Sequence, residues 1–192
     1  MMIRRLLSLG LAAATLSAAA CTNDNQAEGN KAQTPAAQKA AGTKTIAAGM
    51  PVNSRFIAIA KAAGLDQTLA GPGPYTVLVP DDAAFAKAPA GSLDPKPENR
   101  AQLTGALTNM ILPGTVLAAD IGKAIDNGKG KAVLLTMGGG TLTATKDGGT
   151  IVLTNDAGDK ARVTKADDQF SNGVVHHVDA VLMPAGGRPA GG

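Results

Sequence analysis

The stretch Tyr75–Phe85 reads YTVLVPDDAAF and joins a strand signal to a helix signal. Its first five residues form a short apolar run, which predicts a strand that Pro80 brings to an end. Asp81 or Asp82 can then cap a helix, because a carboxylate accepts hydrogen bonds from the free amides of a first turn. Phe85 follows inside this helix, where its ring can turn onto the sheet.

A second informative stretch, Asn172–Pro184, reads NGVVHHVDAVLMP near the end of the chain. Asn172 and Gly173 predict a turn that tolerates positive φ and aligns the strand that follows. That last strand is predicted over Val174–Met183, and Pro184 stops it.

Three helices are predicted outside these two stretches. The first begins at Asn53 or Ser54 and ends at Gly64. The second begins at about Pro97 and is stopped by Pro113 and Gly114. Its apolar stripe is Leu103, Leu107, Met110 and Ile111. The third covers Ala118 to Ile125 and ends at Asn127–Gly128.

Strands dominate the second half of the chain. Thr141–Thr145 and Thr150–Thr154 flank KDGG, which predicts a hairpin. Lys160–Lys165 predicts a further strand, and Asp167–Asp168 predicts a solvated turn. Helices first and a strand meander later favour the α+β class.

Taken in order, these segments resemble the fasciclin domain family across residues 45–184. The resemblance implies a fasciclin-like fold, with N-terminal helices packed on a β-sheet wedge and a C-terminal β meander. It also implies a binding or adhesion module and no enzyme. The residues that match the family's structural signature are Pro80, Asp81, Phe85, Pro113, Gly114, Asn172, Gly173 and His176.

One position departs from the family pattern. Many members carry Tyr-His or Asn-His where this chain has Asn109-Met110. That region is associated with integrin binding in animal relatives. Because the histidine is replaced, an integrin-type function is not carried over to this chain.

The N-terminus has the features of an export signal. Arg4 and Arg5 precede an apolar run, Leu6–Ala20, that is too short to favour a membrane-spanning helix. The single cysteine, Cys21, follows this run as in a bacterial lipobox. We expect residues 1–20 to be a lipoprotein signal peptide and Cys21 to carry lipid, which anchors the protein to a membrane. The alternative is ordinary cleavage that leaves a free thiol.

Composition divides the rest of the chain. Residues 21–44 are rich in small and polar residues and predict a disordered tether, as do residues 185–192 for the tail. Residues 45–184 are predicted to form the fasciclin domain. Thr22 stands where an aspartate would indicate inner-membrane retention, so the resemblance to sorted lipoproteins favours the outer membrane.

Charge and cysteine content exclude some classes. The formal net charge is +3, and removing Arg4 and Arg5 with residues 1–20 leaves 16 basic against 15 acidic residues. This balance offers no basic patch for nucleic acid. One cysteine excludes an internal disulfide.

Two adjacent histidines invite a metal hypothesis, but neighbours on a strand point to opposite faces. His176 shares its face with Val174 and Val178 and is expected to be buried and structural. His177 shares its face with Asp179, and this pair is the candidate interaction surface. Neither is expected to be catalytic.

No motif predicts a catalytic, cofactor or metal site. Asp156 and Asp159 resemble part of a calcium loop, but the spacing favours a plain turn. Three functions remain: a lipid-anchored envelope or surface module that binds a protein or glycan, a periplasmic carrier of a small molecule or lipid in an apolar cleft, and a purely structural envelope protein. An exposed apolar patch would favour the first, and an enclosed pocket of several hundred Å³ the second.

Overall fold

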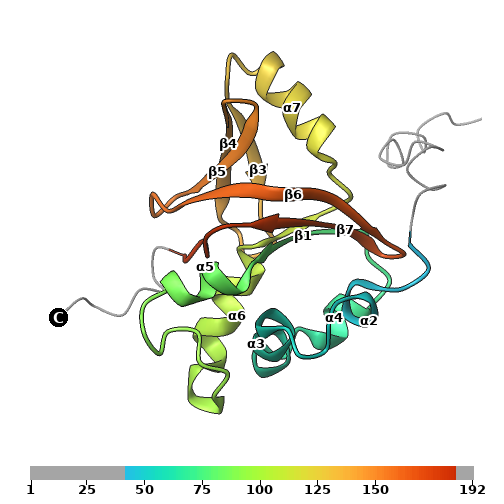
Figure 1. Cartoon of the computed structure of the whole chain (residues 1–192), viewed down its shortest axis with the longest axis vertical. Coiled ribbons are helices and arrows are strands. Elements are labelled where there is room, and N and C mark those ends of the chain that lie inside the picture. Colours follow the sequence, from blue (N-terminus) through green and yellow to red (C-terminus); the bar gives the residue numbers. More distant parts are fainter. Residues whose placement is uncertain (1–41, 185–192) are drawn as a thin grey trace, which may run out of the picture. The chain divides into compact units, whose positions relative to one another are not determined.

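The computed structural model describes residues 42–184, in which helices pack against a seven-stranded sheet (Figure 1). The predicted signal peptide, Cys21, most of the tether and the tail lie outside the described residues. The helices are α2 (Ile46–Gly49), α3 (Arg55–Ala63), α4 (Asp66–Ala70), α5 (Asp82–Lys87), the 3-10 turn η1 (Pro97–Asn99), α6 (Arg100–Thr108) and α7 (Ala118–Asn127).

The sheet follows the order β2-β1-β7-β6-β5-β4-β3. Its strands are β1 (Tyr75–Pro80), β2 (Ile111–Pro113), β3 (Ala132–Leu135), β4 (Thr141–Asp147), β5 (Thr150–Asn155), β6 (Lys160–Phe170) and β7 (Gly173–Val178). The first strand pairs in parallel with the last, and every other pairing in the sheet is antiparallel. The α+β class is confirmed.

Local capping follows the sequence signals. Ser54 is the residue that caps α3, and its Oγ accepts a hydrogen bond from the amide of Ile57 at 3.3 Å. Gly64 ends that helix in a left-handed conformation with φ of 75°. At α5 the cap is Asp81, whose Oδ1 accepts from the amide of Ala84 at 2.7 Å.

The second predicted helix is too long at its C-terminal end. It ends at Thr108, and Ile111–Pro113 forms β2 beside β1. The apolar spacing continues past the helix end, but pairing with β1 overrides the helical period. The amide of Leu78 donates to the carbonyl of Met110 at 2.8 Å, so this segment completes the sheet instead of the helix.

The last predicted strand is also too long. It ends at Val178, because β1 ends opposite it at Pro80 and α5 then begins. Asp179 turns away and exchanges backbone and side-chain hydrogen bonds with Arg162. The segment that follows still buries Leu182 without strand pairing.

The predicted turn at Asp167–Asp168 lies inside a longer strand. The sixth strand continues to Phe170 and shifts its register against β7 around Lys165 and Asp168. Asp167 has a φ of 61°, so the conformation is turn-like while the strand goes on. The sequence patterns also do not indicate α2, α4 or β3, which are all short.

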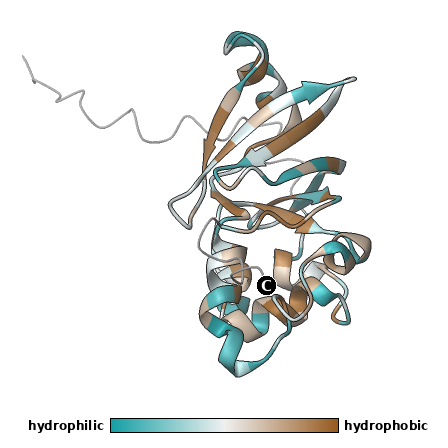
Figure 2. Ribbon diagram, turned by 90° about the vertical axis from the view of Figure 1, so that its left-hand side faces the viewer, coloured by the Kyte–Doolittle hydropathy of each residue, from teal (hydrophilic) through white to brown (hydrophobic). Residues whose placement is uncertain are grey.

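The core has two parts, one on each face of β1 and β7. Val77 and Val79 pack with the helical cluster around Phe56 and Leu103. Leu78, on the opposite face, belongs to the cluster that α7 forms with β3 to β5. Figure 2 shows hydrophobic stretches along the strands and hydrophilic ones at turns and helix surfaces. Strands covered on both faces explain the continuous apolar runs of the sequence.

Candidate functional site

His176 lies fully buried at the centre of the sheet. Its Nε2 lies 2.9 Å from the carbonyl oxygen of Val116, and its Nδ1 accepts from the amide of Asp167 at 3.2 Å. Because an amide only donates and a carbonyl only accepts, the tautomer with hydrogen on Nε2 satisfies both partners. This arrangement agrees with a structural role.

A second buried polar side chain holds the loop that contains Val116 and leads into α7. Thr76, also fully buried, donates from Oγ1 to the carbonyl of Gly114 and accepts from the amide of Val116, both at 2.8 Å. Asp167 accepts from the amide of Ala118, the first residue of α7, at 2.9 Å. Asp167, which lies in the β-bulge where β6 shifts its register against β7, therefore supplies the helix cap that Leu117 does not provide.

Asn172 links three segments that are distant in sequence. Its Oδ1 accepts from the amide of Ile46 at 2.8 Å, and its Nδ2 donates to the carbonyls of Leu69 and Gly71 at 2.8 Å each. The sequence indicates only a turn here. Gly173 is required by close approach, because a Cβ would lie 2.0 Å from the carbonyl oxygen of Tyr75.

His177 lies on the opposite face, with its side chain 30% exposed. Its Nε2 lies 3.1 Å from Oδ2 of Asp168, which also accepts from the amine of Lys165 at 2.7 Å. The hydrogen bond from Lys165 holds the pKa of Asp168 below its usual value; partial burial opposes this effect and His177 adds to it.

Asp179, which was expected to share a face with His177, bonds a different residue. Oδ1 of Asp179 accepts from the backbone amide of Arg162 at 2.7 Å. Strict alternation fails because β7 ends at Val178, and the bulge in β6 brings Asp168 beside the histidine instead. Whether this surface binds a partner stays a prediction.

The remaining signature residues have structural partners. Phe85 is 3% exposed within the helical cluster, and the guanidinium of Arg55 lies 5.8 Å from its ring centroid. Gly114 has a φ of 89°, which suits the sharp exit after Pro113. Met110, where many family members have histidine, is buried in the second cluster.

The acidic side chains of the NDAGD turn, residues 155–159, accept hydrogen bonds from neighbouring segments. Asp156 accepts from the amide and hydroxyl of Thr141, which lowers the pKa of its carboxyl. Asp159 bonds the amide of Met183 and the side chain of Asn155. Across residues 42–184, His, Cys, Asp and Glu form no group of three that could hold a metal ion. Within the same range, no helix is long and apolar enough to cross a bilayer.

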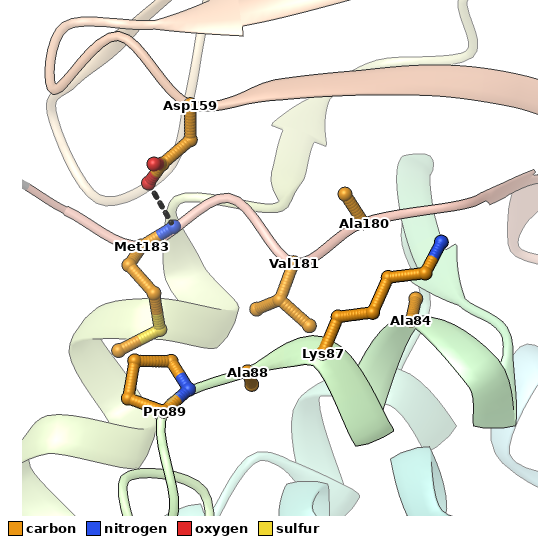
Figure 3. A pocket seen from close by; sticks show the side chains of 8 residues that line it. All are labelled: Ala84, Lys87, Ala88, Pro89, Asp159, Ala180, Val181 and Met183. Carbon is orange, nitrogen blue, oxygen red and sulfur yellow. Dashed lines mark hydrogen bonds between the residues drawn. The ribbon is translucent and has the colours of Figure 1, made fainter.

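Two of the depressions on the surface are lined wholly by residues within 42–184. One, of about 130 Å³, lies between α5 and the segment after β7, and Figure 3 shows its apolar floor with Lys87 and Asp159 at opposite sides. Its lining is Ala84, Lys87, Ala88, Pro89, Asp159, Ala180, Val181 and Met183. The other, of about 230 Å³, lies beside Asn109, the triplet Gly138–Gly140 and Asp156.

Three large apolar side chains are exposed along one strand and the residues after it. Val133, Leu135 and Met137 are 67%, 66% and 46% exposed and alternate along β3 and just beyond it. We call these three residues the β3 stripe. Ala132 and Leu134, which alternate with the stripe residues, pack on the inner cluster with α7. The run AVLL is compatible with a buried strand and with an exposed edge strand, so the sequence does not predict the exposure of these side chains.

Comparisons with known proteins agree on one family. Residues 51–184 match the model of the fasciclin domain. The chain is similar to protein sll1483 of Synechocystis sp., with 33% identity over 142 residues, covering 72% of this chain and 71% of that protein. It is also similar to the transforming growth factor-beta-induced protein ig-h3 of Sus scrofa, with 31% identity, covering 64% of this chain and 16% of the other.

A solved structure supports the fold independently. It is a FAS1 domain pair from the insect cell adhesion molecule fasciclin I, with a TM-score of 0.62 and 18% identity. The alignment covers 76% of this chain and 53% of that chain, so this chain spans about half of the pair.

Proposed function

The chain belongs to the fasciclin domain family, and on this premise we propose that it is a lipid-anchored module of the bacterial cell envelope that binds a protein or glycan. Two lines of support come from relatives and from the surface. The similar solved structure comes from a cell adhesion molecule. The β3 stripe supplies a surface suited to contact with a partner.

The observation that carries the proposal is the exposure of the β3 stripe. Large apolar side chains in water lose the stabilisation that burial would give, about 25 cal/mol for each Å². Single exposed apolar residues are common, but a contiguous group on a regular strand is typical of an interaction surface. Val133 and Leu135 are each about two-thirds exposed on one face of one strand, which is such a group.

The two depressions are small and open compared with typical small-molecule sites. Small-molecule sites are commonly about 300–1,000 Å³ and enclose most of their ligand. The two described depressions measure about 130 and 230 Å³ and are open to solvent. Neither of these two depressions therefore supports a lipid or small-molecule carrier.

Chemical catalysis also has little support. The buried His176 has both ring nitrogens engaged by backbone groups, and Asp167 caps a helix. His177 and Asp168 are paired to each other at the surface. These side chains maintain structure, and the family context is that of adhesion-type proteins.

The anchor is proposed from the sequence. A lipid on Cys21, after removal of residues 1–20, would hold the domain at the outer membrane. We expect Cys21→Ser to move the protein from the membrane fraction to the released fraction. Intact mass of the membrane-extracted protein provides the check, since an unmodified Cys21 would contradict the anchor.

Partner binding is tested by affinity capture from solubilised envelopes with full-length protein. The double variant Val133→Thr/Leu135→Thr removes the two most exposed side chains of the stripe and places β-branched residues, which suit a strand, at both positions. Val52→Thr is the matched control, because Val52 is 82% exposed outside the stripe. We expect the double variant to lose proteins or glycans that the parent and the control retain. Equal capture by all three would exclude the stripe as the binding surface.

A further inference from the structure

Met137 differs from the other methionines of the described structure in its access to solvent. It is 46% exposed at the end of the β3 stripe. The other three methionines between residues 42 and 184 are nearly covered, with Met50 at 7%, Met110 at 1% and Met183 at 3%. Because an oxidant in water has to reach the sulfur, Met137 is the methionine of this range that is open to oxidation in the folded protein.

The backbone around Met137 is held by groups other than its side chain. The amide of Met137 donates to the carbonyl of Ile111 at 2.7 Å, and the amide of Gly138 donates to the carbonyl of Thr108 at 3.0 Å. Thr136, on the other side, is buried. A chemical change at the thioether of Met137 therefore alters the surface without removing these bonds.

The β3 stripe contains one side chain that a peroxide can oxidise under mild conditions. Val133 and Leu135 carry only hydrocarbon, whereas Met137 carries a polarizable thioether sulfur. A lone pair of this sulfur attacks one oxygen of hydrogen peroxide, so that a sulfur–oxygen bond forms as the oxygen–oxygen bond breaks. The proton on the transferred oxygen moves to the departing hydroxide, which leaves as water. The sulfur is thereby oxidised to a sulfoxide and the peroxide is reduced.

We propose that Met137 is a site of reversible oxidation by hydrogen peroxide, and that its sulfoxide weakens binding through the β3 stripe. The second half of this inference rests on the proposed function. A sulfoxide is polar and accepts hydrogen bonds from water, so covering it with an apolar partner surface costs free energy. Methionine sulfoxide reductases restore the thioether, which makes the change reversible.

The site is tested by following oxidation of each methionine separately. Full-length protein is treated with hydrogen peroxide, folded and in urea, and peptide mapping by mass spectrometry measures the gain of one oxygen at each position. In the folded protein we expect Met137 to be oxidised at least about tenfold faster than the three covered methionines. In urea the rates should become similar, because burial no longer protects any of them. Equal rates in the folded protein would overturn the inference.

The effect on binding is tested by affinity capture from solubilised envelopes, with peroxide removed before the extract is added. Each protein is compared with its own untreated sample. We expect oxidised parent to bind its captured partner about tenfold more weakly and to recover after treatment with a methionine sulfoxide reductase. Peroxide should not change capture by Met137→Leu, which has no oxidisable sulfur at this position. Met50→Leu, a change at a covered methionine, should respond to peroxide as the parent does.

The outcomes separate this inference from the proposed function. Capture by the parent that does not change on oxidation of Met137 would overturn the inference and leave the proposed function standing. Equal loss of capture in Met137→Leu would also overturn it, as would a thermal melt showing that oxidation of Met137 unfolds the protein. An untreated parent that captures nothing through the stripe would refute the proposed function and, with it, the claimed effect on binding.

Discussion

The centre of the sheet buries polar side chains, and its β3 edge exposes apolar ones. Thr76, Asn172 and His176 are almost completely buried, yet each makes at least two hydrogen bonds to backbone groups. Val133 and Leu135 are large and apolar, yet about two-thirds exposed. Both arrangements reverse the usual distribution of residues. At the centre the hydrogen-bond partners are present and fix the fold, whereas no other part of residues 42–184 covers Val133 and Leu135, for which we propose an external partner.

The largest expected effect compares a buried apolar side chain with an exposed one. Phe85→Ala should lower the free energy of unfolding by about 3–5 kcal/mol, because few other rings can fill the cavity. Leu135→Ala should change it by less than about 0.5 kcal/mol. Urea melts of both variants measure the difference. A large loss for Leu135→Ala would place the stripe in the core and remove its claim to be a contact surface.

The next effect tests the buried polar centre. Asn172→Ala should cost about 3 kcal/mol, because it leaves the amide of Ile46 and the carbonyls of Leu69 and Gly71 without their side-chain partner. Asn99→Ala is the control, since Asn99 bonds carbonyls in a more exposed loop and should cost less than about 1 kcal/mol. Similar losses for both would show that Asn172 contributes no more than a surface link.

The two histidines separate the faces of β7. His176→Ala should cost about 1–3 kcal/mol, since the amide of Asp167 and the carbonyl of Val116 lose a buried partner. His177→Ala removes one part-exposed contact with Asp168 and should cost less than about 1 kcal/mol. Paired denaturant melts at neutral pH make the comparison. A larger loss for His177 would contradict the assignment of faces.

The smallest effect concerns pH. Lys165 lowers the pKa of Asp168 in the folded protein, so the ionised carboxylate stabilises the fold above the unfolded-state pKa. That contribution is lost as pH falls through the lowered folded-state pKa. Lys165→Ala should raise the pKa of Asp168 toward its ordinary value, as followed by NMR titration of the side-chain carboxyl. Lys96→Ala, which removes a separate ion pair with Asp94, should leave it unchanged. An unmoved Asp168 pKa in Lys165→Ala would refute the stated cause.

Local signals in the sequence account for much of the fold. The cap at Asp81, the end of α3 at Gly64 and the hairpin between β4 and β5 each depend on neighbouring residues, and the structure has all three. Errors occur where a distant partner decides. Ile111 continues a helical apolar spacing but pairs with Val77, which no local pattern reveals.

The candidate interaction surface shows the same contrast between features set by neighbouring residues and features set by distant ones. Alternation along β7 places His176 and His177 on opposite faces, but the bulge in β6 decides that Asp168, and not Asp179, meets His177. The stripe on β3 is apolar in the sequence and becomes unusual only because that strand lies at the edge of the sheet. Edge position is a property of topology, so composition and periodicity do not indicate it.

The central claim is that the β3 stripe is covered by a partner in the cell. A photo-crosslinking amino acid at position 135 of the full-length protein, activated in living cells, tests it most directly. Position 52 serves as the control, since Val52 is the more exposed residue. We expect defined cross-linked species with an envelope protein or glycan from position 135 and none from position 52. No cross-link at position 135, or equal cross-linking at both positions, would contradict the account.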